Sequence, residues 1–450
     1  MSPGRPGRNL AVTTPASRPR GAPAPRANAG ADHNTDVGAR WSHRFTWLAM
    51  FVYLGKVADI FPALAPLQIG KVLVALAVIA VLIEGGAGWR GLNRDPIWRP
   101  FLGILALIVL TLPVGVWPGN SFNFVVQTFS KELMFIFLVV GTTRSPGDVR
   151  RLVWAFAFNA ALLDFALYKY GVLDVEKISL GRNEIAMISA MAIGLLAPLH
   201  TRGLAKLIKL GLIGLMVTTI LFSNSRGGYL GLAAVGVAYL YLRVGGKIAV
   251  SALMVLLLGA LIYIQLPSYV KGRVDSIINY EQDYNLTAQD GRIQIWQRGL
   301  TMIANDPLTG VGFRNFPIAE GLMHQNVQGQ PWMNAHNSPL QVAAEIGVIG
   351  LIFYITLLVR MYRASKRLRF HAAVVEHRHL GTGLTLGFVG YVVCGFFLSQ
   401  GFTPVFYILM ALILAAARVT QLTEEASADN RNARPAYAAR YNRNRHVVSR

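Results

Sequence analysis

Long apolar stretches recur along most of the chain, and they constrain its fold more than any other feature. Twelve of them come close to the roughly 20 residues with which a helix crosses a bilayer. Because 53% of the residues are hydrophobic and only 14% are charged, a water-soluble globule is excluded. The sequence predicts an all-α polytopic membrane protein with about 12 transmembrane helices. They lie near 45–65, 67–84, 99–117, 122–141, 148–170, 183–200, 204–223, 226–243, 246–266, 339–361, 380–399 and 401–418.

The chain carries a formal net charge of +21, and the distribution of its cations along the sequence indicates the membrane topology. If the N-terminus is cytoplasmic, 31 of the 43 Lys and Arg residues fall in the tails and the cytoplasmic loops. This is the positive-inside pattern, so both termini are predicted to be cytoplasmic and no nucleic-acid partner is expected. The basic tails 1–40 and 419–450 have no continuous apolar stretch, and we expect both to be disordered.

One large extramembrane segment, 267–338, separates the membrane helices of 41–266 from those of 339–418. It falls between the ninth and tenth predicted helices, on the non-cytoplasmic side, and loops of this length are usually functional. We expect a helix capped by Thr287 within it, with an apolar face. That face consists of Ile293, Trp296, Leu300 and Ile303. Ser338 is predicted to cap the tenth helix, with Pro339 in its first turn.

Two residues on the non-cytoplasmic side stand out for their chemistry. Arg226, in "SNSRGG", lies where the charge bias leaves few cations, and a guanidinium binds phosphate oxygens in a bidentate manner. His336 lies two residues before a predicted helix start, which favours the neutral imidazole and hence a group that can accept a proton. The alternatives are an interfacial anchor for Arg226 and a simple turn hydrogen bond for His336.

Further polar residues are candidates with weaker signals. Arg182, Arg292 and Arg314 could also bind phosphate, whereas Arg298 is expected to anchor the membrane interface. The carboxylate of Glu345 is costly two turns inside a span unless it is paired or faces a wet cavity. Lys131, Glu132 and Asp164 indicate a polar interior, which is either a substrate cavity or pairing between helices. The "HRH" of 377–379 is expected in a solvated cytoplasmic loop. We predict no metal site and no cofactor, and the single Cys394 excludes an intrachain disulfide.

Three stretches of the sequence resemble the O-antigen ligase superfamily, which contains lipopolysaccharide O-antigen ligases and repeat-unit polymerases. They are "SNSRGGYLGL", "GRIQIWQRGLTMIANDPLTGVGF" and "AHNSPLQVAAEIGVIGL", all within about residues 210–360. The resemblance implies a C-type glycosyltransferase-like fold that works on the periplasmic face of the bacterial inner membrane. Its donor would be a glycan on undecaprenyl diphosphate, and its acceptor the sugar hydroxyl of lipid A–core or of a growing glycan.

The resemblance also assigns roles to residues at matching positions. Arg226, Arg292 and His336 correspond to the two arginines and the histidine of the family's catalytic site. The residues expected to contact substrate around them are Arg182, Arg314, Asn337, Ser338 and Glu345. The sequence leaves ligase and polymerase open, a chain-length regulator being a further partner in the second case. A transporter of small anions such as bicarbonate is the alternative from a different class.

Overall fold

The structure, a computed structural model, describes residues 40–424 except 90, 175–176, 178, 278, 280–290, 324–331 and 372–374. Contacts divide the chain into residues 1–40 and 41–450, and only the second unit is described below. Every regular element in the described part is a helix, as predicted. Nearly all of the tail predicted over 1–40 lies outside the described residues. In the tail predicted over 419–450, residues 419–424 are helical and the rest lies outside them.

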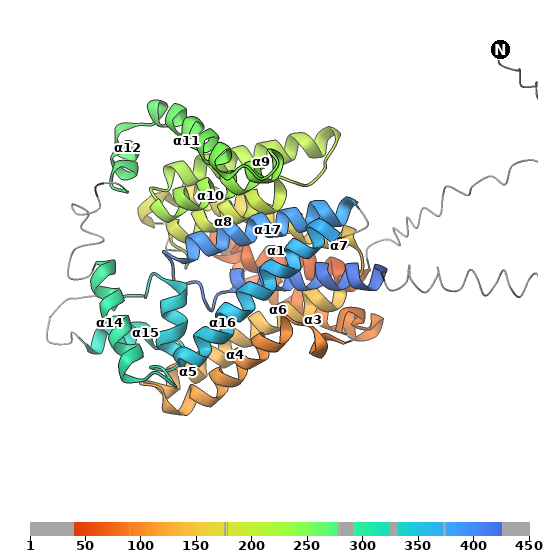
Figure 1. The fold of residues 1–450 in the computed structure, drawn as a ribbon. Helices are drawn as coiled ribbons and strands as arrows, with labels where there is room; N and C mark the ends of the chain where they lie inside the picture. The colour runs from red at the N-terminus through yellow and green to blue at the C-terminus, as the bar shows by residue number, and fades with distance from the viewer. Residues whose placement is uncertain are drawn as a thin grey trace, which may run out of the picture. The chain divides into compact units, whose positions relative to one another are not determined.

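Each of the twelve predicted apolar ranges overlaps a helix or a pair of consecutive helices, although the first range, 45–65, extends beyond α1 into the short helix α2 (Val57–Ile60) (Figure 1). These are α1 (Trp41–Leu54), α3 (Ile69–Glu84), α4 (Trp98–Thr111), α5 with α6 (Pro118–Phe124 and Ser130–Thr142), α7 (Pro146–Asp174), α8 (Arg182–Leu196), α9 (Gly203–Phe222), α10 (Arg226–Arg243), α11 (Ile248–Gln265), α16 (Ser338–His371), α17 (Val375–Gly395) and an unlabelled C-terminal helix (Pro404–Glu424). Seven helices in the described part are long and apolar enough to cross a membrane, so the chain is a polytopic membrane protein. That twelve segments cross stays a prediction.

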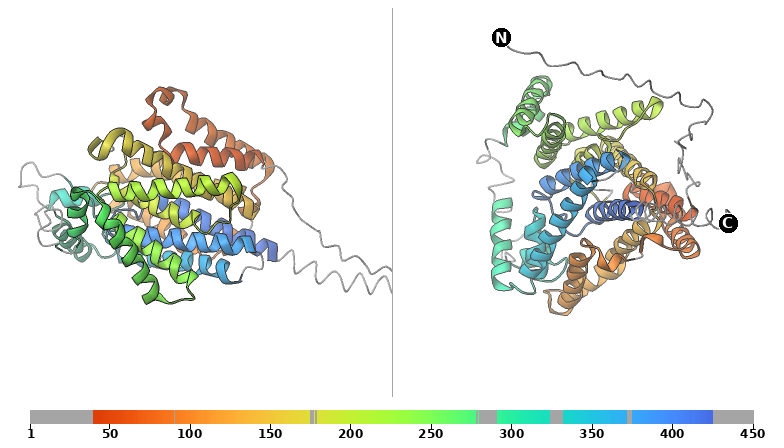
Figure 2. Two further views of the ribbon diagram at one scale, coloured as in Figure 1. Left: turned by 90° about the horizontal axis from the view of Figure 1, so that it is seen from above. Right: turned by 45° about the vertical axis from the view of Figure 1, so that its right-hand side comes forward.

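The C-terminal helix forms the centre of the bundle. Almost every residue from Val405 to Ala416 is buried. Tyr407 packs on Phe129, between α5 and α6, with ring centroids 5.4 Å apart, and Phe406 stacks on Tyr391 of α17 at 5.2 Å. The right-hand view of Figure 2 shows this dark blue helix between α16 and α17 on one side and the orange helices on the other.

Helix α16 is kinked where another part of the chain inserts into its hydrogen-bond ladder. The carbonyls of Ala344 and Glu345 accept the N–H groups of Val311 and Gly312, at 2.8 and 3.0 Å. Gly347 takes φ 76°, and a Cβ there would lie 2.2 Å from the carbonyl oxygen of Leu308. The kink therefore places the segment before α15 (Phe316–Leu322) against the membrane helices.

Three shorter helices lie at the left of Figure 1, with α14 and α15 side by side and α12 apart from them, after α11. They are α12 (Ser268–Asp275), α14 (Arg292–Asn305) and α15, and all belong to the predicted extramembrane segment 267–338. We call this left-hand end of the bundle the loop-helix end. Helix α11, which precedes α12, exposes most of its apolar side chains, as a helix facing lipid does.

Candidate functional site

Arg226 is the first residue of α10, at the loop-helix end. The turn before it is shaped by Asn224, whose φ of 56° lies in the left-handed region. Ser225 is the N-cap of the helix, because its Oγ accepts the N–H of Gly228 at 3.1 Å. The "SNSRGG" sequence thus supplies a turn, a cap and then an arginine at the start of a helix.

Small residues bring α8 and α17 against the first two turns of α10. A Cβ on Gly228 would lie 2.7 Å from Ala186 of α8, and a Cβ on Gly231 would lie 2.2 Å from Cys394 of α17. Because Arg182 is the first residue of α8, one turn before Ala186, the two helices begin side by side with an arginine at each start. The structure therefore brings Arg182 close to the start of α10.

The turn Phe396–Gln400, which follows α17, connects the start of α10 to the loop helices. A Cβ on Gly227 would lie 3.4 Å from Phe397. On the other side, the indole of Trp296 in α14 meets the ring of Phe396 edge to face, with centroids 5.9 Å apart. The beginning of α10 and the face of α14 are thus separated by two adjacent phenylalanines.

His336 lies against the same turn. Its N–H donates to Ser399 Oγ at 2.8 Å, and its φ of 47° is unusual for a residue other than glycine. The side chain is half-buried. Burial, and after it the charge of Arg292, lowers the pKa of the imidazole from 6.5 to about 4. His336 is therefore neutral at neutral pH, as predicted, although the cause is burial and a nearby cation rather than the helix start.

The cap of α16 lies one residue earlier than predicted. Asn337 Oδ1 accepts the N–H of Leu340 at 2.9 Å, so the prediction that Ser338 is the cap is wrong. Ser338 Oγ instead donates to the carbonyl of Leu398 at 2.7 Å and accepts the N–H of Gln400 at 2.9 Å. The serine hydroxyl does not cap its own helix because it is hydrogen-bonded to the backbone of the turn after α17.

Arg292 is the first residue of α14, and a hydrogen bond holds this helix beside the residue that precedes His336. The indole Nε1–H of Trp296 donates to the carbonyl of Ala335 at 3.0 Å. This bond explains why the charge of Arg292 reaches the imidazole. The predicted helix cap Thr287 lies outside the described residues.

The apolar face predicted for α14 is partly wrong. Ile293 and Leu300 are 38% and 59% exposed. Helix α16 approaches so closely at Gly299 that a Cβ there would lie 2.9 Å from Leu340. A glycine adds nothing to a hydrophobic pattern, so the pattern alone could not identify this contact. The buried residues are Ile295, Gly299 and Met302.

Arg298 is an ion-pair partner and not the interfacial anchor that we predicted. Its Nη2 lies 2.6 Å from Oε1 of Glu320 in α15, a fully buried carboxylate. The second oxygen of Glu320 accepts the N–H of Met333 at 2.9 Å. Arg298 therefore stabilises the packing of α14 on α15, since a buried carboxylate without a partner is strongly destabilising.

Arg314 and Glu345 lie together at the kink of α16. Glu345 is buried, and its Oε2 accepts the N–H of Arg314 at 2.8 Å, while Oε1 accepts from Gln341 Nε2 at 3.3 Å. The guanidinium of Arg314 covers the ring of Phe124 in α5, at 4.4 Å from its centroid. Hydrogen bonding explains how a carboxylate is tolerated at this depth, and the predicted contacts of Arg314 and Glu345 with substrate stay predictions.

The polar residues inside the spans are dispersed. Asp164 of α7 accepts a hydrogen bond from Ser189 of α8 at 2.8 Å, as expected for pairing between helices, one of the two predicted alternatives. Glu132 is buried in α6, whereas its neighbour Lys131 is exposed, so these two residues lie on different faces of that helix.

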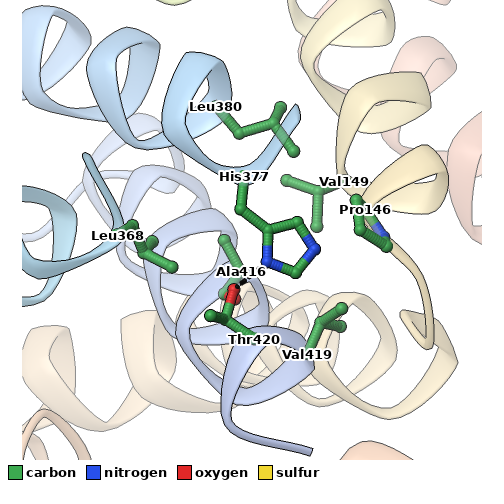
Figure 3. Close-up of a pocket in the computed structure, with 8 residues that line it drawn as sticks. All are labelled: Pro146, Val149, Leu368, His377, Leu380, Ala416, Val419 and Thr420. Carbon is green, nitrogen blue, oxygen red and sulfur yellow. Dashed lines mark hydrogen bonds between the residues drawn. The ribbon is translucent and has the colours of Figure 1, made fainter. Parts of the chain in front are cut away.

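The "HRH" motif is helical and its first histidine is packed, whereas Arg378 is exposed and His379 half-buried, so the predicted loop is wrong (Figure 3). His377 is buried, and its Nδ1 lies 2.8 Å from Thr420 Oγ1 of the C-terminal helix. The ring is enclosed by apolar side chains, among them Val149 and Val419. Because α17 begins at Val375, earlier than predicted, the first of the two histidines turns toward the bundle.

Arg273 and Ser399 are the residues near this site that the sequence did not single out. Arg273 of α12 donates through Nε to the carbonyl of Asn224 at 3.2 Å, and Ser399 accepts from His336. The one available signal for Arg273 was its charge on the side where few cations are expected. No pattern marked Ser399.

The comparison with known families agrees with this geometry. Residues 211–355, from α9 to the first half of α16, match the family model described as O-antigen ligase. This stretch of the chain is similar to an O-antigen ligase domain. The domain includes Arg226, Arg292 and His336, and it supports a membrane enzyme that transfers glycan, in broad terms. A comparison with curated proteins found no match.

Proposed function

We propose that this domain transfers a glycan from undecaprenyl diphosphate to an acceptor sugar hydroxyl at the periplasmic face of the inner membrane. One observation carries the proposal. Three helices of the site begin with an arginine, namely α8 at Arg182, α10 at Arg226 and α14 at Arg292. A fourth, α16, begins two residues after His336. The contacts of the Phe396–Gln400 turn connect the starts of α10, α14 and α16, and the approach of Gly228 to Ala186 connects α8 to α10.

The ligand class follows from the electrostatics of helix starts. Unpaired N–H groups give a helix N-terminus a partial positive charge, and an arginine at the same position increases the local positive potential. Helix N-termini bind phosphate, and guanidinium groups contact phosphate oxygens through two parallel hydrogen bonds. A lipid-linked diphosphate supplies two adjacent anionic groups. Two phosphates can therefore be bound by different helix starts among those of α8, α10 and α14.

The chemistry assigns a separate role to each residue. The bond between the anomeric carbon and the diphosphate oxygen breaks, and Arg226 and Arg292 stabilise the negative charge that develops on the leaving diphosphate. The acceptor hydroxyl oxygen forms the new bond to that carbon, and its proton passes to the neutral imidazole of His336. A pKa of about 4 makes this a weak base in the empty site, and the anionic donor raises the pKa when it binds.

The orientation is part of the proposal. We place both termini in the cytoplasm and twelve spans across the membrane, so that the loop-helix end faces the periplasm. The basic segments between α6 and α7 and between α8 and α9 then lie on the cytoplasmic side. Their cations include Arg144 and Arg202, and Arg150 lies near the start of α7.

The decisive experiment uses purified full-length protein in detergent, with a lipid-diphosphate glycan as donor and a lipid A–core as acceptor. Formation of a longer glycan-bearing product supports the proposal. Because detergent solution contains no separate compartments, a transporter of small anions gives no product, and that result would overturn it.

A deletion strain distinguishes the two acceptors. Loss of a ligase leaves long glycan chains on the carrier lipid, whereas loss of a polymerase leaves core capped by one repeat unit. Both outcomes are read on a gel of the extracted lipopolysaccharide.

A further inference from the structure

Two arginines connect α12 to the turn before α10 by hydrogen bonds that run in opposite directions. Arg273 of α12 donates through Nε to the carbonyl of Asn224 at 3.2 Å. Arg226 of α10 donates through Nη1 to the carbonyl of Ser276, just after α12, at 3.4 Å. We call these four residues the arginine clasp.

The clasp fixes the orientation of the Arg226 side chain through two backbone carbonyls, those of Asn224 and Ser276. The left-handed conformation of Asn224 turns its carbonyl toward α12, and Arg273 holds this carbonyl in place. Ser276 is the C-cap of α12, where unpaired carbonyls carry partial negative charge. Arg226 is therefore placed between the positive start of α10 and the negative end of α12, which fixes the side of α10 on which its guanidinium lies.

The positive charge of Arg273 also acts on residues at the start of α10. Arg273 and Arg182 both act electrostatically on the phenol of Tyr229, one turn into α10. The hydroxyl of Tyr229 donates to the carbonyl of Leu221 at 2.9 Å, so its position is fixed. Three arginines from α8, α10 and α12 thus surround one helix start.

We propose that Arg273 is a positioning residue for glycan transfer, which holds the Asn224 turn so that Arg226 faces the donor diphosphate. This inference rests on the proposed function of the site. It connects the end of α12, the first helix of the extramembrane segment, to the start of α10 through the side-chain hydrogen bonds of the clasp. It also predicts that the two arginines of the clasp act as one unit.

A double-mutant cycle in the detergent assay tests this unit. Arg273→Gln is expected to lower kcat/KM about 10- to 100-fold, because small misplacements of a positioned group have effects of this size. The loss is expected in kcat, since Arg226 acts on charge that develops in the transition state. In an Arg226→Ala background, Arg273→Gln is expected to cause no further loss. Equal losses in both backgrounds, or wild-type activity of Arg273→Gln, would overturn the inference.

Controls separate positioning from charge and from folding. Lys271→Gln removes a cation from the same short helix, where Lys271 donates to the carbonyl of Ile264 at 3.0 Å, and should leave transfer unchanged. Arg273→Lys keeps a charge and a donor, so it should retain more activity than Arg273→Gln while thermal unfolding stays the same for both. An equal loss in the two Arg273 variants, or a loss in the Lys271 variant, contradicts positioning by the clasp. If Arg226→Ala alone keeps full activity, the proposed function of the site fails and not merely the role of Arg273.

Discussion

Two groups of cations, one at each end of the bundle, stand in opposite relations to the helix dipoles. At the end away from the loop helices, Arg144 and Lys209 donate to carbonyls at helix C-termini, although Arg202 and Lys247 are the N-caps of α9 and α11. Arg144 donates to the carbonyl of Glu84, the last residue of α3, at 3.0 Å. Lys209 donates to the carbonyl of Leu199, just after α8, at 2.7 Å. These arrangements are the favourable ones, because cations compensate the partial negative charge of helix C-termini.

At the loop-helix end, arginines are the first residues of α8, α10 and α14. A cation at that position adds to the partial positive charge of the helix start. The first group of cations thus stabilises helix ends, whereas under the proposed function the second group binds the donor diphosphate. Five predictions test this division, from the largest expected effect to the smallest.

Replacing His336 should have the largest effect. His336→Asn is expected to lower kcat about 10²- to 10⁴-fold, the usual contribution of a general base. Asparagine tolerates the left-handed backbone at this position, so the fold should be kept. Single-turnover rates with saturating donor measure the effect, and a near-normal rate in correctly inserted protein would remove His336 from the mechanism.

The pH dependence follows from the lowered pKa of His336, whose neutral form is the active one. Activity of the wild type should fall as the pH falls toward about 4. Stability should respond in the same direction, because the unfolded state binds the proton more readily than the folded state between 6.5 and about 4. Unfolding curves across this range, with His336→Asn as reference, should show the variant losing less stability than the wild type.

Arg226→Ala should lower kcat about 10²- to 10³-fold, as does loss of one charge-stabilising donor in other enzymes. Arg226→Lys should recover part of the loss, since an ammonium retains the charge without the bidentate geometry. The matched control is Arg150→Ala at the opposite end, where Arg150 pairs with Glu376 at 3.6 Å. Comparable losses of kcat in the Arg226 and Arg150 variants would contradict the different roles assigned to the cations at the two ends.

Arg144→Ala should show the reverse pattern. It removes the side-chain donor from the end of α3, and we expect a decrease of about 1.5–3 kcal/mol in the free energy of unfolding. Turnover per folded molecule should stay unchanged. Denaturation in detergent combined with the transfer assay measures both, and a large loss of turnover with unchanged stability would contradict the assignment.

The smallest expected effect is a shift of the pH profile of activity in Arg292→Gln. The charge of Arg292 lowers the pKa of His336, so its removal should shift the acid limb of the profile to higher pH. The profile is normalised to its own plateau, which separates this shift from any weaker donor binding. Arg298→Gln is the control on the same helix, because Arg298 pairs with Glu320. A shift in the opposite direction would place Arg292 away from the imidazole.

Local chemistry was readable in the sequence where it depends on a few consecutive residues. The start of α10 at Arg226 is one example, since Ser225 supplies a cap and glycines follow. The cap of α16 is a counterexample. Asn337 and Ser338 are both good capping residues, and only the backbone of the Phe396–Gln400 turn, some 60 residues away, decides between them.

The contacts that involve glycine escaped prediction for a different reason. The hydrophobic pattern of α14 favoured Leu300, but Gly299 is the residue that contacts Leu340 of α16. The kink at Gly347 likewise depends on the backbone of Leu308, which no pattern within α16 encodes. Close backbone approach is a property of two segments together.

The sequence by itself determined the helical membrane fold, the positions of its apolar segments and the membership of Arg226, Arg292 and His336 in one set of candidates. Hydrophobicity and charge act locally along the chain, which is why these features can be read from it. Tertiary structure decided which residues meet: Arg292 with His336, Arg226 with Ser276, and Arg298 with Glu320. Such pairs are set by the packing of helices far apart in sequence, and no local pattern contains that information.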